Sequence, residues 1–265
     1  MVKLIVSDID GTLVPDGSGA GVMNPAYFSV IRDLAARGIT FVACSGRQYV
    51  SVYKVFEPVA DQIFFICEGG GFVSNGNRDV LHSAAIPLDV AYELIRDARQ
   101  IPQLDIMVAG IKRSYCRSAD SELYRWMVND YGFDIEAHAD IDQHIDDEVL
   151  KVSLYHRNAV EALTKDSFVP KWENRVKTVL AGIQWLDCVS KESGKGSAVA
   201  FLQNHLGVTR EETIVFGDNQ NDIEMFAHAG VSYAVAGARE EVKQAADQIC
   251  APMEEDGVLQ VLKNI

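Results

Sequence analysis

The stretch Leu4-Ile5-Val6-Ser7-Asp8-Ile9-Asp10-Gly11-Thr12 carries the strongest indication of the fold. Its apolar start is short and rich in β-branched residues, which is typical of a buried strand in a parallel sheet. Asp8 and Asp10 are separated by one residue, so both side chains leave the end of this strand on the same side. Two close carboxylates repel each other unless a cation lies between them or one is protonated. The stretch therefore predicts a charged site at the carboxyl end of a buried strand, since a turn or capping role alone would leave the acids without a counterion.

Strands and helices are expected to alternate on both sides of a long insert. A helix is predicted from Asn24-Pro25 to Gly38, because Asn is a preferred N-cap residue and Pro fits the first helical position. The remaining elements predicted for this part of the chain are strands over 39–44, 63–66, 213–216 and 231–235, and helices over 47–56, 195–206, 222–228 and 240–246. This alternation is typical of an α/β fold with a doubly wound parallel sheet.

The insert has a different pattern. A hairpin with a type I′ turn at Asn75-Gly76 is predicted just before it. Beyond the hairpin the strands carry more polar residues, and residues 150–156 alternate apolar with polar, as a half-exposed strand does. We therefore predict three segments: the first part of the core over 1–82, an inserted α+β module over 83–184, and the second part of the core over 185–265.

Composition limits which partners the protein can bind and indicates the compartment in which it works. Among 265 residues, 38 are Asp or Glu and 24 are Lys or Arg, which gives a net charge of −14 and argues against nucleic acid and anionic membranes as partners. The 5 cysteines are scattered without a Cys-x-x-Cys pair, so we expect a reducing compartment. The start of the chain is too short and too quickly charged for a signal peptide, and no apolar run approaches the length of a membrane helix. These features predict a soluble cytoplasmic protein.

Two further polar motifs follow predicted core strands. They are Ser45-Gly46-Arg47 and Gly217-Asp218-Asn219-Gln220-Asn221-Asp222. Ligands of open parallel sheets bind beyond the carboxyl ends of the strands, so these motifs should converge with Asp8 and Asp10. Carboxylates without His or Cys favour hard divalent cations, and Mg²⁺ is the usual one beside phosphates. Asp222 could instead simply cap the helix that follows it.

Two helix starts indicate an anion. The Ser45 hydroxyl and free backbone N–H groups can bind a phosphate, although Ser and Gly are also ordinary residues at a helix start. Lys195 stands at the start of a core helix, where its charge opposes the helix dipole. A bound phosphate would explain that unfavourable position, whereas the alternative is a solvated lysine.

In their order along the chain, these motifs resemble those of the haloacid dehalogenase-like hydrolase superfamily. The resemblance rests on Asp-x-Asp-Gly-Thr, then Ser-Gly-Arg, then Lys-Gly, then Gly-Asp-x-x-Asn-Asp. The position and size of the α+β insert resemble the Cof-like type IIB branch. The resemblance implies a Rossmann-like core with a mobile cap, and Mg²⁺-dependent hydrolysis of a small phosphomonoester, often a sugar phosphate.

The resemblance also implies roles for individual residues. Asp8 matches the nucleophile and Asp10 the general acid/base, so the reaction would pass through an aspartyl-phosphate. The implied metal ligands are Asp8, the backbone carbonyl of Asp10, Asp218 and Asn219. The implied phosphate-binding groups are the backbone N–H of Ile9 and residues Ser45, Gly46, Lys195 and Asn221. Thr12 and Asp222 would hold these groups in position without contacting the metal or the phosphate themselves.

Several alternatives stay open at this point. Relatives commonly carry Asn-Gly where this chain has Glu68-Gly69, which puts the substrate preference in doubt. Lys191 is a second candidate lysine, and Arg47 could serve either the substrate or a structural ion pair. A hexose phosphomutase or phosphotransferase shares the same Asp-x-Asp chemistry, and a catalytically inactive sugar-phosphate sensor is a third reading. His138, His144 and His156 lie in the insert without metal-ligand spacing, so we expect no ligand role for them. Neither the substrate nor the oligomeric state is predicted.

Overall fold

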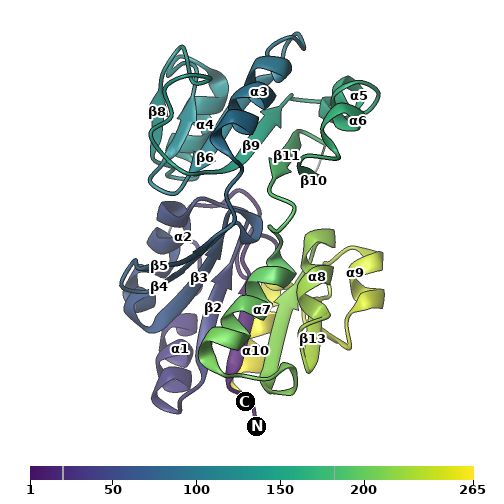
Figure 1. Cartoon of the computed structure of the whole chain (residues 1–265). Coiled ribbons are helices and arrows are strands. Elements are labelled where there is room, and N and C mark those ends of the chain that lie inside the picture. The colour runs from purple at the N-terminus through teal and green to yellow at the C-terminus, as the bar shows by residue number, and fades with distance from the viewer. Residues whose placement is uncertain (20, 182) are drawn as a thin grey trace. The chain divides into compact units, whose positions relative to one another are not determined.

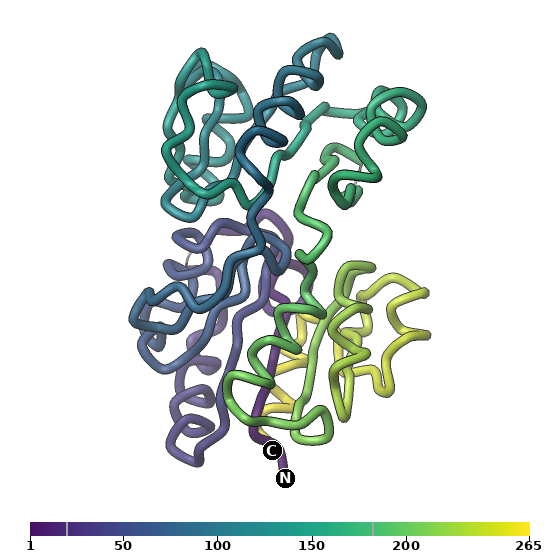
Figure 2. The backbone as a smooth tube through the Cα atoms, in the orientation of Figure 1, coloured from purple at the N-terminus to yellow at the C-terminus, as the bar shows by residue number. Residues whose placement is uncertain are grey.

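The computed structural model describes residues 1–19, 21–181 and 183–265. The chain divides into two compact units (Figure 1). One unit, the core, joins Met1–His82 to Gly194–Ile265, and the other, the cap, is Ser83–Ser193. The backbone leaves the core in its blue segment and returns to it in green (Figure 2), so the cap is an insertion into the core.

The core contains an 8-stranded sheet. Its strands, from one edge to the other, are β14 (Gln248–Cys250), β13 (Val231–Val235), β12 (Thr213–Gly217), β1 (Leu4–Asp8), β2 (Thr40–Cys44), β3 (Ile63–Cys67), β4 (Phe72–Asn75) and β5 (Val80–Ser83). The strands from β14 to β3 are parallel, and β4 joins β3 in the antiparallel sense. The predicted α/β class with a parallel core sheet is confirmed.

The helices of the core are α1 (Ala26–Ala36), α2 (Tyr49–Phe56), α7 (Lys195–Leu206), α8 (Ile223–Phe226), α9 (Glu240–Ala245) and α10 (Gly257–Leu262). α1 begins where the sequence predicts, because the Asn24 side chain accepts a hydrogen bond from the Ala26 N–H at 3.0 Å. α1 contacts α10, whereas α7, α8 and α9 form a second group of contacting helices.

Strand β1 lies at the centre of the sheet, between β12 and β2, and all of its residues are buried. Burial from both sides suits its apolar, β-branched sequence. The register pairs Asp8 with Cys44 and Ser7 with Phe216, so β1, β2 and β12 end at the same edge. The three sequence motifs that follow these strands are thereby brought together, as predicted.

The cap contains a mixed 6-stranded sheet. Its order is β10 (Lys177–Ala181), β11 (Trp185–Val189), β9 (Val149–Tyr155), β6 (Asp105–Gly110), β7 (Ser114–Cys116) and β8 (Ile135–Ala137). Its helices are α3 (Leu88–Ala98), α4 (Glu122–Asn129), α5 (Val160–Thr164) and α6 (Phe168–Trp172). A large apolar cluster joins the sheet to α3, α5 and α6, and a smaller one joins it to α4.

The second segment boundary differs from the prediction. We expected the core to resume at residue 185, but the compact units divide between Ser193 and Gly194. The reason is that β11 pairs with β9 and β10 and so belongs to the cap sheet.

Two local predictions were wrong. Strand β9 is not half-exposed: Lys151 is only 7% exposed and Ser153 only 2%, because both bind Asp187 on the neighbouring strand. The turn between β4 and β5 is not type I′ at Asn75-Gly76. It closes through the Arg78 N–H and the Asn75 carbonyl at 3.1 Å, with the positive φ at Arg78.

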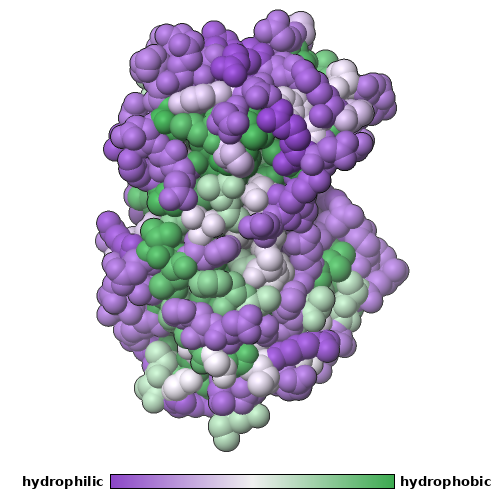
Figure 3. All heavy atoms as spheres, viewed as in Figure 1, coloured by the Kyte–Doolittle hydropathy of each residue, from purple (hydrophilic) through white to green (hydrophobic). Residues whose placement is uncertain are grey.

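One face of each unit can be followed in a space-filling view. Figure 3 shows hydrophilic residues over most of the face of each unit that is turned to the viewer, with hydrophobic residues in smaller groups. Among the described residues, no helix combines the length and the apolar character that a membrane crossing requires.

Candidate active site

Lys195 joins two buried carboxylates at the edge of the core sheet. Its Nζ lies 2.5 Å from Oδ1 of Asp8, at the end of β1, and 2.7 Å from Oδ1 of Asp222, beyond the end of β12. The three side chains are 2%, 5% and 0% exposed for Lys195, Asp8 and Asp222. Lys195 is therefore not a solvated lysine. Lys195 lies in the first turn of α7, where the helix dipole disfavours a positive charge. The attraction of the two neighbouring acids outweighs this effect.

Asp222 has a second task in the loop after β12. Its Oδ2 accepts hydrogen bonds from the backbone N–H groups of Asp218 and Asn219, both at 3.0 Å. In the turn Gln220–Asp222 this carboxylate is the last member of a capping box whose N-cap residue is Asn219, and it binds Lys195 as well. Its side chain forms no capping bond to α8, so the alternative that Asp222 simply caps the following helix is wrong. Since one side chain holds both the loop and the lysine, Asp222 fixes the position of Asp218 relative to Lys195.

Asp218 faces the loop that follows β1. Its Oδ1 accepts a hydrogen bond from the Thr12 hydroxyl at 3.1 Å. Gly11 has a φ of 80°, and a Cβ at this position would lie 2.5 Å from Oδ2 of Asp218. Glycine is therefore required here both by the backbone conformation and by the close approach of the carboxylate.

The charges of this cluster do not balance. Oxygen atoms of Asp8, Asp218 and Asp222 lie within 4.8 Å of one another, and Lys195 is the ammonium group bound to two of them. Burial and then the nearby Asp222 raise the pKa of Asp8 well above its ordinary value. The same two causes raise the pKa of Asp218 to about 6. For Lys195, burial opposes the charge, but Asp222 and Asp8 outweigh it and hold its pKa well above the ordinary range.

The donor set of this cluster fits a hard divalent cation. All of its candidate ligand atoms are carboxylate oxygens, and two of the three acids are fully buried beside a single lysine. A cation would offset the repulsion that raises the pKa of Asp8 and Asp218. We call Asp8, Asp218, Asp222 and Lys195 the core cluster.

Arg47 binds the second acid of the first motif. Its Nε lies 2.8 Å from Oδ2 of Asp10, and one of its terminal nitrogens contacts the other carboxylate oxygen, so the pair is bidentate. Arg47 is only 4% exposed, and its backbone N–H donates to the Ser45 hydroxyl at 3.1 Å. Of the two roles that the sequence left open for Arg47, the structure shows an ion pair. Its partner was not anticipated, although Arg47 follows the strand next to β1.

The remaining predicted residues differ in their surroundings. Ile9 is buried, and its carbonyl accepts from the Leu13 N–H at 2.8 Å. Gly46 is exposed at the start of the loop before α2. Asn219 uses its side-chain oxygen to accept from the Gln220 N–H at 2.8 Å, and Asn221 is exposed in the same turn.

The two candidate lysines differ in burial and in the unit to which they belong. Lys191 is exposed and belongs to the cap unit, whereas Lys195 is buried in the core cluster. Glu68, at the position where the resemblance implies Asn, is 2% exposed and has a φ of 51°. Its backbone N–H donates to the Arg47 carbonyl at 3.1 Å, so this departure lies beside the Arg47 loop.

Comparisons with known proteins identify the family of the chain. The sequence model of the family described as haloacid dehalogenase-like hydrolase matches residues 5–262. The chain is 25% identical over 264 residues to the 5-amino-6-(5-phospho-D-ribitylamino)uracil phosphatase of Escherichia coli, covering 100% of this chain and 96% of that protein. A Bacillus subtilis phosphatase of the same name is 24% identical over 265 residues, with 99% and 95% covered. A crystal structure of a Eubacterium rectale protein superposes with a TM-score of 0.91 at 37% identity, covering 99% and 98% of the two chains.

Proposed function

Because the chain belongs to the haloacid dehalogenase-like hydrolase family, we propose that it is a Mg²⁺-dependent phosphatase that hydrolyses a small sugar or polyol phosphate. The observation that carries this proposal is the placement of Lys195 between Asp8 and Asp222 in a buried cluster of acids. A carboxylate that is held beside an ammonium group can approach a phosphoryl group whose negative oxygens that ammonium also attracts.

The first step forms a phosphorylated enzyme. A carboxylate oxygen of Asp8 attacks phosphorus, and the bond from phosphorus to the ester oxygen of the substrate breaks. Asp10 gives a proton to the departing alkoxide, and Lys195 offsets negative charge on the phosphoryl oxygens. The products of this step are the free alcohol and an aspartyl-phosphate at Asp8.

The second step restores the enzyme. Asp10 takes a proton from water, the water oxygen bonds to phosphorus, and the bond from phosphorus to Asp8 breaks. Arg47 orients Asp10 through both carboxylate oxygens. Inorganic phosphate leaves, and Asp8 is again a carboxylate.

The divalent cation has a defined place in this scheme. We propose that Asp8, Asp218, Asn219 and the Asp10 carbonyl hold Mg²⁺, and that Ile9, Ser45, Gly46, Lys195 and Asn221 bind the phosphate. When bound, Mg²⁺ supplies positive charge to the phosphoryl oxygens. Thr12 and Asp222 keep Asp218 in position, since they bind its carboxylate and its backbone N–H, respectively.

The substrate class rests on the relatives. The Escherichia coli and Bacillus subtilis proteins are named for a substrate that carries its phosphate on a ribityl chain. A phosphorylated sugar or polyol is therefore the class to test first for this chain. The dispersed and buried cysteines and the acidic composition support a cytoplasmic location and no nucleic-acid partner.

Phosphate release tests the proposal. The purified chain is given a panel of sugar and polyol phosphates and a nitrophenyl phosphate, with Mg²⁺ and then with EDTA. We expect inorganic phosphate to appear with Mg²⁺ and to stop with EDTA. Transfer of phosphate to a second sugar without release would instead indicate a phosphotransferase, and no turnover of any phosphomonoester would contradict the proposal.

A further inference from the structure

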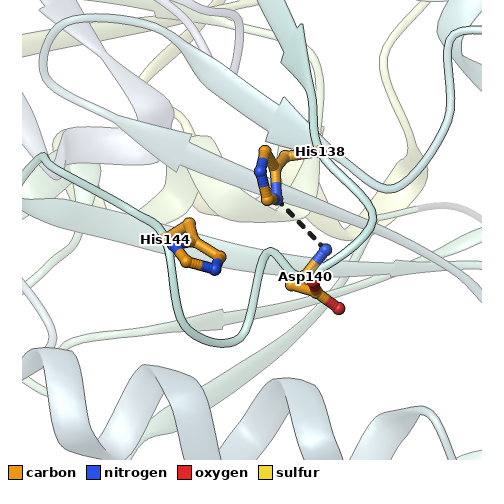
Figure 4. A group of neighbouring side chains, drawn as sticks. All are labelled: His138, Asp140 and His144. Atoms are coloured by element: carbon orange, nitrogen blue, oxygen red, sulfur yellow. Dashed lines mark hydrogen bonds between the residues drawn. The ribbon is translucent and has the colours of Figure 1, made fainter.

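We propose that His138, Asp140 and His144 form a binding site for a transition-metal ion of the Zn²⁺ type on the cap, which we call the cap triad. All three residues are exposed, and a ligand atom of each lies within 4.8 Å of the others. They belong to one loop, as Figure 4 shows, between β8 and β9. Two imidazoles and one carboxylate suit Zn²⁺, Cu²⁺ or Ni²⁺, whereas Mg²⁺ prefers oxygen donors.

The loop that carries the cap triad is fixed at its start. The His138 N–H donates to the Cys116 carbonyl at 2.9 Å, which continues the pairing of β8 with β7. Arg99, just beyond the end of α3, donates to the Ala139 carbonyl at 2.5 Å and forms an ion pair with Asp142. The backbone around the first two proposed ligands is therefore held in place before any metal binds.

The second half of the loop is fixed by burial. Ile141 is 1% exposed and Ile145 is 5% exposed, and both belong to the main apolar cluster of the cap. The Ile145 N–H donates to the Tyr92 hydroxyl at 3.1 Å. Buried residues thus alternate with the exposed Asp140 and His144, so the loop presents the proposed ligands on its outer side.

A turn explains how this spacing can serve a metal. The Gln143 N–H donates to the Asp140 carbonyl at 3.0 Å, which brings His144 back toward His138. The two imidazole centroids lie 4.7 Å apart. The sequence led us to expect no ligand role, because His-x-Asp-x-x-x-His is not a familiar metal spacing. The turn makes the rings neighbours in a way that the spacing does not reveal.

Metal binding requires small side-chain movements. Tetrahedral Zn²⁺ with ligands at about 2.0–2.1 Å needs them about 3.3 Å from one another, so the three side chains must draw together. Because all three are exposed, rotation of their side chains can supply this movement. Among the described residues, Asp140 forms no ion pair, which leaves its carboxylate available to a cation.

One hydrogen bond provides a signature of binding. The Nδ1 of His138 accepts from the Asp140 N–H at 3.2 Å, the dashed line of Figure 4. A cation at Nδ1 replaces this proton donor, and a cation at Nε2 moves the ring proton to Nδ1. In either case the Asp140 N–H loses its acceptor, so its amide resonance must shift when the metal binds.

A matched pair of variants tests the site. His156 is the control, because its Nδ1 also accepts from the N–H two residues later, at 3.3 Å, and it lies outside the cap triad. Zn²⁺ is titrated by calorimetry into the whole chain in excess Mg²⁺, which occupies the core cluster. We expect His144→Ala and His138→Ala each to lower the affinity at least about tenfold, and His156→Ala to leave it unchanged. Equal Zn²⁺ affinity in all four proteins would overturn the proposal.

Electron paramagnetic resonance with Cu²⁺ as the probe identifies the donor atoms. The cap triad should give nitrogen splitting from two imidazoles, reduced to one in His144→Ala. The core cluster has carboxylate ligands, and the cysteines are buried. Nitrogen splitting that survives His138→Ala and His144→Ala together would contradict the proposal. Phosphatase activity with Mg²⁺ should be unaltered in these variants, so this test is independent of the proposed function.

Discussion

The core cluster and the cap triad each set three potential metal ligands within 4.8 Å, but in opposite surroundings. In the core cluster, buried carboxylates compete for one lysine, and burial raises the pKa of Asp8 and Asp218. In the cap triad, exposed imidazoles and one carboxylate face water. Proximity alone therefore does not define a site.

The difference shows how surroundings select the ligand. A buried set of oxygen donors with an unbalanced charge favours a hard cation and a phosphoryl group, because water cannot screen the repulsion. In an exposed set with imidazoles, water screens the charges, so the set selects metals by donor type and geometry instead. Substitutions in the core cluster should accordingly have large effects on activity, and substitutions in the cap triad should have none.

Replacing the nucleophile should give the largest contrast between the two regions. We expect Asp8→Asn to lower kcat by at least about 10⁴-fold, since loss of a nucleophile commonly costs this much or more. His144→Ala should keep the activity of the wild type. Steady-state release of inorganic phosphate measures both, with Asp16→Asn as an exposed acidic control. Comparable losses in Asp8→Asn and His144→Ala would break the distinction.

The next-largest contrast is expected between the two candidate lysines. Lys195→Ala leaves Asp8 and Asp222 buried without their shared partner, so we expect kcat to fall about 10²–10³-fold. The free energy of unfolding should fall by about 3–5 kcal/mol, as when one partner of a buried ion pair is removed. Lys191→Ala, at an exposed position, should change neither quantity. Turnover and urea unfolding are the measurements, and the reverse ranking would remove Lys195 from the phosphate site.

Arg47 should have a smaller effect that depends on the leaving group. Its bidentate pair with Asp10 corresponds to a charge-assisted hydrogen bond, so Arg47→Met should cost roughly 10- to 100-fold in kcat for an alkyl phosphate. A nitrophenyl leaving group needs little protonation, so the loss in its first step should be smaller. Rapid-quench rates of that step with both substrates measure this difference. Equal losses would mean that Arg47 acts on something other than Asp10.

The smallest expected effect is the stabilisation of the chain by Mg²⁺ and its dependence on pH. Mg²⁺ at a hundredfold excess over its Kd should stabilise the chain by about 2.7 kcal/mol, and the gain in Tm should shrink as the pH falls through about 6, where Asp218 takes up a proton. Without metal, stability changes with pH in the opposite direction, because the folded state holds the proton of Asp218 more tightly than the unfolded state does. The free energy of unfolding should then fall as the pH rises from 3.8 to about 6.

Thermal unfolding with Mg²⁺ or EDTA at several pH values measures both trends. His138→Ala should leave the Mg²⁺ shift intact, since its ring is not among the oxygen donors of the core cluster. A shift that is independent of pH, or that disappears in His138→Ala, would assign the Mg²⁺ effect to another site.

Much of the core could be predicted because its signals are local. Buried parallel strands appear as short apolar runs, and the acids that follow them must lie at one edge whatever the loop conformation. Lys195 was identifiable because a lysine in the first turn of a helix opposes the dipole, which a bound phosphate would explain. Its contacts with Asp8 and Asp222 exclude a solvated lysine, and the phosphate contact stays a prediction.

The missed features depend on partners that are distant in sequence. The alternation in β9 predicts exposed polar residues, yet Lys151 and Ser153 are buried and bind the half-buried Asp187 on β11. Alternation of polar residues cannot show whether their partner is water or an acid on another strand. The Arg47–Asp10 pair and the cap triad likewise depend on strand order and on a turn, which residue spacing does not encode.

Asp10→Asn gives the most direct test of the central claim, that Asp8 is phosphorylated during turnover. This variant removes the proton transfer, worth about 10²–10⁴-fold, but keeps the nucleophile and Lys195. A nitrophenyl phosphate should still phosphorylate it, while hydrolysis of the intermediate slows. Acid quench followed by mass spectrometry should find one phosphoryl group on Asp8 in the variant, and much less in the wild type. Hydrolysis as fast as in the wild type, or no label on Asp8, would contradict the account.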